Sequence, residues 1–307
     1  MSIHNKSFII KFYRNKLGLT QEQLAEGICN TITLAKYENG TLNPSDDNFH
    51  KIMSKLWEHN DMIIFNVQTD NLYFSVIRDE LLLLFESHRY EEAQQKIDKI
   101  KSEKMLCGFY KENQQFIERI QYNILIENNM ITIEEYIKKL ESLLKLTFPE
   151  YNADLFISKL IYTETELLIL NNIATAYGQL NQCEIANTIF YKVIEQLKCS
   201  SEEYKPIYLL YINYANFLGI HENFDKSIEV CKQGIHWLIQ NNKANYLYNF
   251  YYNIGWNLLE KYKKEPFKKK LKELGKLYIW ESYELCMLYP ESSKNAESIK
   301  DFYNEIG

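Results

Sequence analysis

The sequence predicts an all-α protein with a small N-terminal domain and a longer body of helical hairpins. Of its 307 residues, 46% are apolar and 14% aromatic, whereas ten are Gly and five are Pro. Few positions therefore force a helix to end. Apolar residues recur at helical spacing in both parts of the chain. The length also exceeds what a single hydrophobic core usually supports, which favours two domains.

The first two helices are short and have clear boundary signals. A helix is expected over about 6–16, and Gly18, which follows it, ends it. The second helix is expected to open at Gln21. Thr20 is its capping residue, with Gln23 three positions later, where a capping box places its second member.

The third and fourth helices follow the same logic. Asn30 is the predicted cap of a helix over 31–38, and Asn39 with Gly40 ends it. Pro44 and Ser45 restart the chain for a fourth helix, whose apolar residues close a small core.

Two segments together resemble the helix-turn-helix domains of the XRE type: Leu17–Glu26 (LGLTQEQLAE) and Leu34–Gly40 (LAKYENG). The resemblance covers about residues 7–56. It implies that the third helix enters the major groove of double-stranded DNA and that Gln21 binds a phosphate. The DNA-binding residues so predicted are Gln21, Thr31, Ile32, Thr33, Ala35 and Lys36.

Physical chemistry supports these assignments in part. Methyl groups of Thr and Ile can contact thymine, and Lys36 can reach a guanine edge or a phosphate. The alternative is that Thr31 and Thr33 form hydrogen bonds with the unpaired backbone groups at the end of the helix and that Lys36 is a solvated charge. Because this helix lacks Gln or Arg at its start, DNA shape is expected to contribute to recognition.

The charge distribution fits a DNA-binding head on an acidic body. Residues 1–56 contain seven Lys or Arg against five Asp or Glu, although the whole chain has a net charge of −6. This asymmetry is typical of a modular DNA binder with a separate regulatory domain.

The body contains an internal repeat. Asn172–Tyr177 (NIATAY) is matched 41 residues later by Asn213–Leu218 (NYANFL), and after 40 more by Asn253–Trp256 (NIGW). A small residue lies two positions after each Asn, which lets two helices approach closely. These spacings resemble tetratricopeptide repeats. They predict about five hairpins stacked into a right-handed α-solenoid.

The two halves together resemble the RRNPP family of Gram-positive quorum-sensing regulators, especially its PlcR-like and Rgg-like branches. Ala25–Cys29 (AEGIC) and the LAKYENG segment carry this likeness. It implies a DNA-binding domain at 1–66 and a repeat domain at 67–307. It also implies a cytoplasmic homodimer that binds an inverted-repeat operator and a short linear signalling peptide in the concave groove of the repeats.

Asn residues recur on the first helix of the predicted hairpins. An Asn amide offers an acceptor and two donors, so a series of them can pair with the backbone of an extended peptide. The predicted peptide-binding residues are Asn171, Asn172, Asn213, Asn216, Tyr252 and Asn253. The alternative is that these Asn side chains tie one hairpin to the next and that the aromatic residues pack in the core.

Arginines are further candidates in the body. Arg78, Arg89 and Arg119 are possible partners for a peptide carboxylate; the alternative for each is a solvated surface charge.

The last apolar stretch, about 271–289, predicts a helix with apolar residues on more than one face. It is expected to cap the array and to join a dimer contact.

A second hypothesis keeps DNA binding but gives the repeats another task, either dimerisation or binding of a protein partner without any peptide. An enzyme is not expected, because no Gly-rich phosphate loop and no catalytic motif is present. The cysteines form no C-x-x-C pair, so neither a metal nor another cofactor is expected. No apolar run predicts a membrane contact.

Overall fold

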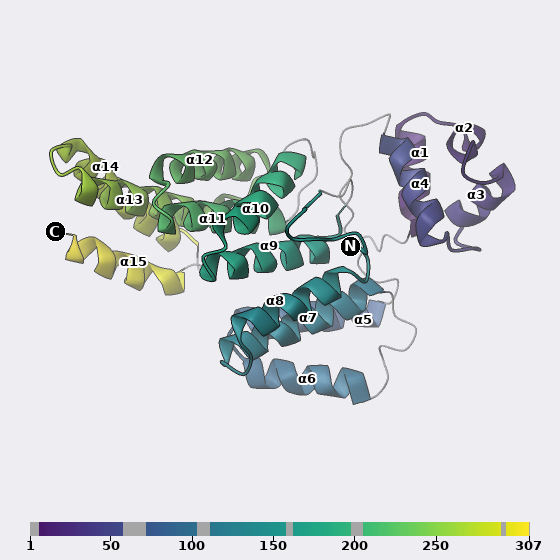
Figure 1. Ribbon diagram of the computed structural model, residues 1–307, viewed down its shortest axis with the longest axis horizontal. Helices are drawn as coiled ribbons and strands as arrows, with labels where there is room; N and C mark the ends of the chain where they lie inside the picture. The colour runs from purple at the N-terminus through teal and green to yellow at the C-terminus, as the bar shows by residue number, and fades with distance from the viewer. Residues whose placement is uncertain are drawn as a thin grey trace. The chain divides into compact units, whose positions relative to one another are not determined.

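The computed structural model describes residues 6–57, 72–102, 111–157, 162–197, 205–289 and 293–306, and its elements are all helices (Figure 1). The predicted all-α class is therefore confirmed. The chain divides into two compact units: Met1–Leu180 with Glu195–Glu202, and Asn181–Ile194 with Glu203–Gly307. The predicted domain boundary at 66–67 falls between the fourth and fifth helices, outside the described residues.

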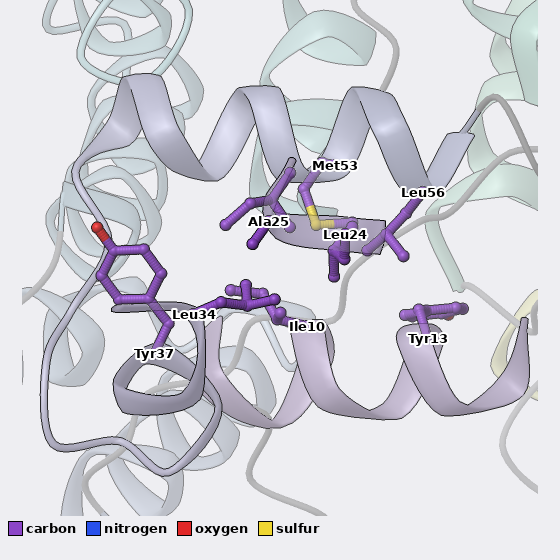
Figure 2. Packing of buried hydrophobic residues seen from close by; sticks show 9 residues of the cluster. Ile10, Tyr13, Leu24, Ala25, Leu34, Tyr37, Met53 and Leu56 are labelled. Carbon is purple, nitrogen blue, oxygen red and sulfur yellow. The ribbon is translucent and has the colours of Figure 1, made fainter. Parts of the chain in front are cut away.

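Four helices form the N-terminal domain: α1 (Lys6–Lys16), α2 (Gln21–Ala25), α3 (Thr31–Glu38) and α4 (Asp46–Trp57). Their buried side chains converge on one core (Figure 2). The core residues are Ile10, Tyr13, Leu24, Ala25, Leu34, Tyr37, Ile52, Met53 and Leu56. Ala25 is almost fully buried, as expected where α2 crosses its neighbours closely.

The boundary signals read from the sequence are confirmed. The Gln23 backbone N–H donates to Thr20 Oγ1 at 3.1 Å, and the Thr20 N–H donates to Gln23 Oε1 at 2.7 Å, which completes the capping box. Asn30 Oδ1 accepts from the Thr33 N–H at 2.7 Å. Gly40 follows α3 with a φ of +71°, a conformation that favours glycine.

The body consists of eleven α-helices in the part described, and four successive pairs of them, α5 with α6, α7 with α8, α11 with α12 and α13 with α14, pack as hairpins. In the first unit lie α5 (Leu72–Glu86), α6 (Tyr90–Ser102), α7 (Lys111–Glu127), α8 (Ile133–Leu144) and α9 (Glu164–Gln179). They are followed by α10 (Cys183–Leu197), α11 (Lys205–Ile220), α12 (Phe224–Gln240), α13 (Leu247–Lys264), α14 (Lys269–Met287) and α15 (Ser293–Glu305). A single 3₁₀ turn, Ala244–Tyr246, precedes α13.

We call every second helix of the body from α5 to α13 an A helix, namely α5, α7, α9, α11 and α13. Within the units, neighbouring A helices contact one another: α7 contacts both α5 and α9, and α11 contacts α13. This arrangement, a tetratricopeptide-like array, is what the repeat spacing predicts.

The turns after the A helices also repeat. A residue with positive φ follows four of these helices, at His88, Asn129, Asn181 and Glu222. Three of these turns share a pair of backbone bonds, as in Asn129 N–H to the Ile126 carbonyl and Met130 N–H to the Leu125 carbonyl. This is a Schellman-type ending, which satisfies the last carbonyls of the A helix. The step from Asn181 to Glu222 equals the 41-residue sequence repeat.

Small residues set the close approach of helices in the second unit. A Cβ added to Gly255 would lie 2.8 Å from the Gly275 carbonyl oxygen, so α13 and α14 touch through their backbones. A Cβ on Gly234 would lie 2.4 Å from Cε1 of Phe250, which is fully buried. The expectation that a small residue two positions after the repeated Asn lets helices approach closely is confirmed at Gly255.

The expectation that the helix at about 271–289 caps the array is wrong. That helix is α14, and α15 follows it and packs against it. The apolar side chains of α15, among them Ile299 and Phe302, join a core cluster with Leu259 and Ile279. The spacing of Ala296, Ile299, Phe302 and Ile306 was a readable helical signal. None of the described helices is long and apolar enough to cross a membrane.

Gly234→Ala is expected to destabilise the second unit by about 1–3 kcal/mol, because the buried Phe250 ring must move to admit the new methyl group. Urea unfolding followed by tryptophan fluorescence measures this. Glu229→Ala, at an exposed site on the same helix, is the control and should change stability by less than about 0.5 kcal/mol. A Gly234→Ala protein as stable as the control would contradict the packing described here.

Candidate DNA-contacting helix and repeat-domain face

Helix α3 has one buried face and one outward face. Leu34, Tyr37 and Glu38 are buried in the domain. Ile32 is 71% exposed, and Lys36 is exposed beside it along the helix. Thr31, Thr33 and Ala35 are half-buried. All five predicted α3 residues thus retain surface that a DNA duplex could contact.

The Thr31 and Thr33 side chains do not cap the start of α3. That start is capped by Asn30, whose Oδ1 accepts a hydrogen bond from the Thr33 backbone N–H. The Thr31 and Thr33 hydroxyls make no hydrogen bond with the described residues. They remain available to a ligand, which favours the DNA-binding interpretation over the helix-end alternative.

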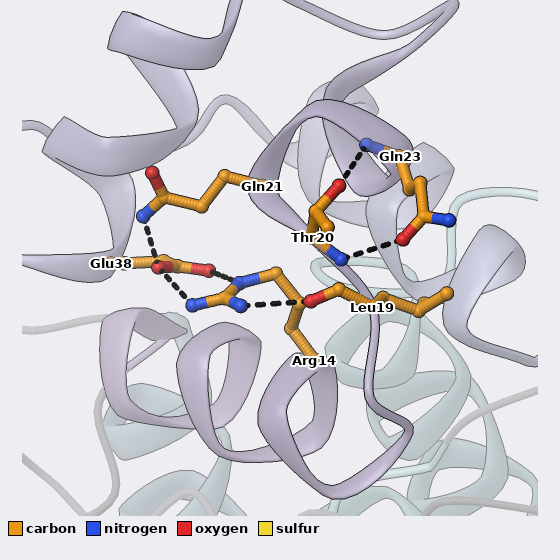
Figure 3. A network of polar contacts seen from close by, with 6 residues as sticks. All are labelled: Arg14, Leu19, Thr20, Gln21, Gln23 and Glu38. Carbon is orange, nitrogen blue, oxygen red and sulfur yellow. Dashed lines mark hydrogen bonds and ion pairs between the residues drawn. The ribbon is translucent and has the colours of Figure 1, made fainter.

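A buried carboxylate connects three elements of the domain (Figure 3). The Glu38 side chain is 1% exposed and lies at the end of α3. Arg14 from α1 donates to both of its oxygens, from Nη2 at 2.9 Å and from Nε. Gln21 Nε2, at the start of α2, donates to Glu38 Oε2 at 2.7 Å. Arg14 also donates to the Leu19 carbonyl at 2.9 Å, in the turn before α2.

This network orients Gln21. One Nε2 hydrogen of its amide points to Glu38, while the second hydrogen and the amide oxygen bond no described residue. The Gln21 side chain is therefore held in one orientation and can still form further hydrogen bonds. A DNA phosphate could be bound by this amide without the side chain first having to reorient.

Sequence reasoning missed the role of Glu38. One weak signal was available, because an acidic residue in the last turn of a helix interacts unfavourably with the helix dipole. The partner itself was not readable, since Arg14 lies 24 positions earlier.

In the first unit, the predicted peptide residues Asn171 and Asn172 lie together on α9. Asn172 Nδ2 lies 2.8 Å from the Asn123 amide and donates to the Tyr136 hydroxyl at 2.9 Å. Burial raises the pKa of Tyr136, which stays protonated. Asn172 therefore ties α9 to the preceding hairpin, and Asn171 is buried next to it.

In the second unit, Asn253 and Asn216 lie together. The Asn253 side chain is buried; its Oδ1 accepts from Ser227 Oγ at 3.2 Å and from Asn257 Nδ2 at 2.6 Å. Its Nδ2 donates to Oδ1 of Asn216, which is exposed on α11. Asn253 thus joins α11, α12 and α13 and positions the Asn216 amide.

The other two predicted peptide residues differ from each other. Tyr252 packs against Phe302 of α15, with ring centroids 5.6 Å apart. Asn213 is half-buried on α11, one turn before Asn216. The structure therefore favours hairpin ties for Asn172 and Asn253, and it leaves Asn213 and Asn216 with surface for a ligand.

The arginines of the body separate into two kinds. Arg89 is exposed and pairs with Glu92, as the surface-charge alternative predicts. That alternative is wrong for Arg78 and Arg119, which are 6% and 5% exposed.

Comparison with known proteins agrees with this architecture. Residues 10–56 match a family model described as helix-turn-helix, and residues 78–274 match the model of the RNPP family C-terminal domain. No curated protein sequence shows significant similarity to the chain.

Solved structures give the same fold at low identity. Bacillus thuringiensis PlcR in complex with the peptide PapR7 and DNA has a TM-score of 0.55 and 22% identity, over 96% of this chain and 98% of PlcR. ComR from S. thermophilus, in complex with DNA and its signalling peptide ComS, has a TM-score of 0.53 and 15% identity, over 99% and 100%. ComR from Streptococcus vestibularis with its cognate signaling peptide XIP has a TM-score of 0.52 and 13% identity, over 98% of each chain.

Glu38→Ala is expected to destabilise the N-terminal domain by about 2–4 kcal/mol, because Arg14 and Gln21 lose the acceptor that binds them. Hydrogen exchange of the α3 amides in the full chain reports this loss. Glu22→Ala, at an exposed site on α2, serves as the control, with a change below about 1 kcal/mol. Unchanged protection of α3 in Glu38→Ala would show that the carboxylate does not brace the helix.

Proposed function

We propose that this chain, which belongs to the RNPP family of DNA-binding regulators, is controlled by a short linear signalling peptide bound along its A helices. In this proposal the chain is a homodimer that presents two copies of α3 to an inverted-repeat operator. The peptide changes the arrangement of the repeats and thereby the spacing of the two DNA-binding domains.

The DNA-binding part of the proposal is carried by one observation. Helix α3 is braced from behind by the Glu38 network and projects Ile32 and Lys36 outward. Such a helix can enter the major groove of DNA with its first turns, while Gln21 contacts a phosphate of the DNA backbone. The family supports regulation, not catalysis, as its task.

The peptide part rests on relatives and on surface chemistry. PlcR and ComR have been crystallised with signalling peptides and DNA. In this chain the exposed Asn216 amide, held by Asn253, offers a donor and an acceptor suited to a peptide backbone. Asn213 extends that surface by one turn of α11, and Asn171, Asn172 and Tyr252 complete the proposed set. Control requires two conformations of the protein and a ligand that prefers one of them.

The second candidate function is a DNA-binding regulator whose repeats serve dimerisation or a protein partner. The internal contacts of Asn172, Asn253 and Tyr252 favour it, because they assign these side chains to the array itself. A stoichiometric protein partner recovered with the chain would support this reading.

A peptide titration separates the two functions. A duplex is first selected from a random library by the chain itself, and its affinity is then measured by fluorescence anisotropy with peptides fractionated from the culture medium of the source organism. The proposal predicts that one fraction changes the Kd for DNA at least about tenfold, which is about 1.4 kcal/mol of coupling. Equal affinity with every fraction would count against peptide control and leave DNA binding intact.

Lys36→Ala is expected to weaken binding to the selected duplex by about 1–3 kcal/mol if Lys36 reads a base, and to weaken all duplexes alike if it contacts a phosphate. The same anisotropy assay, run on specific and scrambled duplexes, distinguishes these cases. Lys232→Ala, an exposed position on α12, is the control and should leave both affinities unchanged. Wild-type affinity of Lys36→Ala for both duplexes would remove Lys36 from the interface.

A further inference from the structure

The arginines of this chain are few, and two of them lack a carboxylate partner in the part that the structure describes. Four of the 35 Lys and Arg residues are arginines. Arg14 pairs with Glu38, and Arg89 pairs with Glu92. Arg78 on α5 and Arg119 on α7 form no ion pair with any described residue.

Arg78 is buried and forms no hydrogen bond with any residue that the structure describes. Its guanidinium lies over the Phe116 ring, 3.9 Å from the centroid, and its Nη1 atom is buried with no partner among the described atoms. Burial lowers the pKa of Arg78 to about 10, which still leaves it charged at neutral pH. The stacked ring covers one face of the guanidinium and leaves its edge, where the N–H groups lie, for another ligand.

Arg119 is buried nearby on the next A helix. Its Nε has no partner among the described atoms, whereas the Asn123 amide lies 3.3 Å from Nη1 and the Tyr136 hydroxyl is close enough to influence the charge of Arg119. Burial also lowers the pKa of Arg119. The positive charge of Arg119 lowers the pKa of Arg78 further, so the two guanidinium groups repel each other.

Two buried cations that repel each other are unfavourable unless an anion joins them. The acid that influences both is Glu164 at the start of α9, which raises the pKa of each arginine without pairing with either. Glu164 itself is partly exposed to solvent. Asp79, an exposed carboxylate beside Arg78 on α5, also raises the pKa of Arg78, but neither acid bonds a guanidinium N–H group among the described residues.

We infer that Arg78 and Arg119 form a carboxylate-binding site between α5 and α7, and that the carboxylate belongs to the peptide of the proposed function. A guanidinium presents parallel N–H groups that match the two oxygens of a carboxylate, and such a group would supply the acceptors that the buried Arg78 Nη1 and Arg119 Nε atoms lack. The site itself stands without the proposed function; the peptide as the source of its carboxylate rests on it.

Sodium acetate tests the site alone. It is titrated into the full chain against sodium chloride at constant ionic strength, while the four arginine Nε–Hε signals are followed by NMR. The signals are assigned from their loss in Arg14→Met, Arg78→Met, Arg89→Met and Arg119→Met. The Arg78 and Arg119 signals should move saturably with acetate, and the Arg89 signal, from an exposed and already paired arginine, should not. No movement, or equal movement of Arg89, would overturn the site.

Two variants test the site further, because each of them keeps at least one of the two arginines. Arg78→Met should weaken acetate binding at Arg119 at least about tenfold, because the carboxylate loses one of the two guanidinium groups that bind it. Glu164→Gln removes the nearby negative charge and should tighten acetate binding several-fold, which remains measurable if Arg78→Met folds poorly. Acetate affinity that is unchanged in Glu164→Gln would contradict the charge argument.

Peptide pools then identify the source of the carboxylate. One pool of random peptides has free carboxyl termini and no Asp or Glu; a second is amidated and contains Asp and Glu. Displacement of acetate by the first assigns a terminal carboxylate, and displacement by the second assigns an acidic side chain. Displacement by neither pool would overturn the assignment to a peptide, while the acetate result and the DNA assay would still stand separately.

Discussion

The buried carboxylate of Glu38 is the constraint on which the DNA-binding head depends. It lies at the end of α3 and receives hydrogen bonds from α1 and from the first residue of α2. A charge in this position is stable because its oxygens are satisfied and its counter-ion, Arg14, is held at the same time by the Leu19 carbonyl. The outward face of α3 and the amide of Gln21 are thereby fixed relative to each other, as a helix that must fit a groove requires.

The repeat domain uses polar side chains differently. Asn253 bonds within the array and leaves Asn216 at the surface, so one amide serves packing and positions another for a ligand. Arg78 and Arg119 differ, since each has a buried nitrogen atom with no hydrogen-bond acceptor among the described residues. Buried amide atoms of Asn113, Gln115 and Asn257 also lack a partner among the described residues, but only the two arginines combine such an atom with a buried positive charge.

Local features were predictable from sequence, and long-range polar contacts were not. Thr20 with Gln23, and Asn30 with Thr33, interact over three residues, and the recurring Asn of the A helices marks a period that the hairpins keep. The Glu38 network joins residues 24 and 17 positions apart, and no pattern links them. The same holds for Arg78 and Arg119, whose burial depends on how α5 and α7 pack. Helix α15 was missed although its apolar spacing was readable.

The account depends most directly on α3 entering duplex DNA. The decisive measurement is the affinity of the full chain for duplexes from its own promoter region as the salt concentration is varied. Tight binding is expected, with a logarithm of the association constant that falls linearly with the logarithm of salt concentration, because in the proposed complex the basic residues of the head neutralise phosphates and release counter-ions. Absence of binding to every such duplex, or an affinity that does not change with salt, would contradict it.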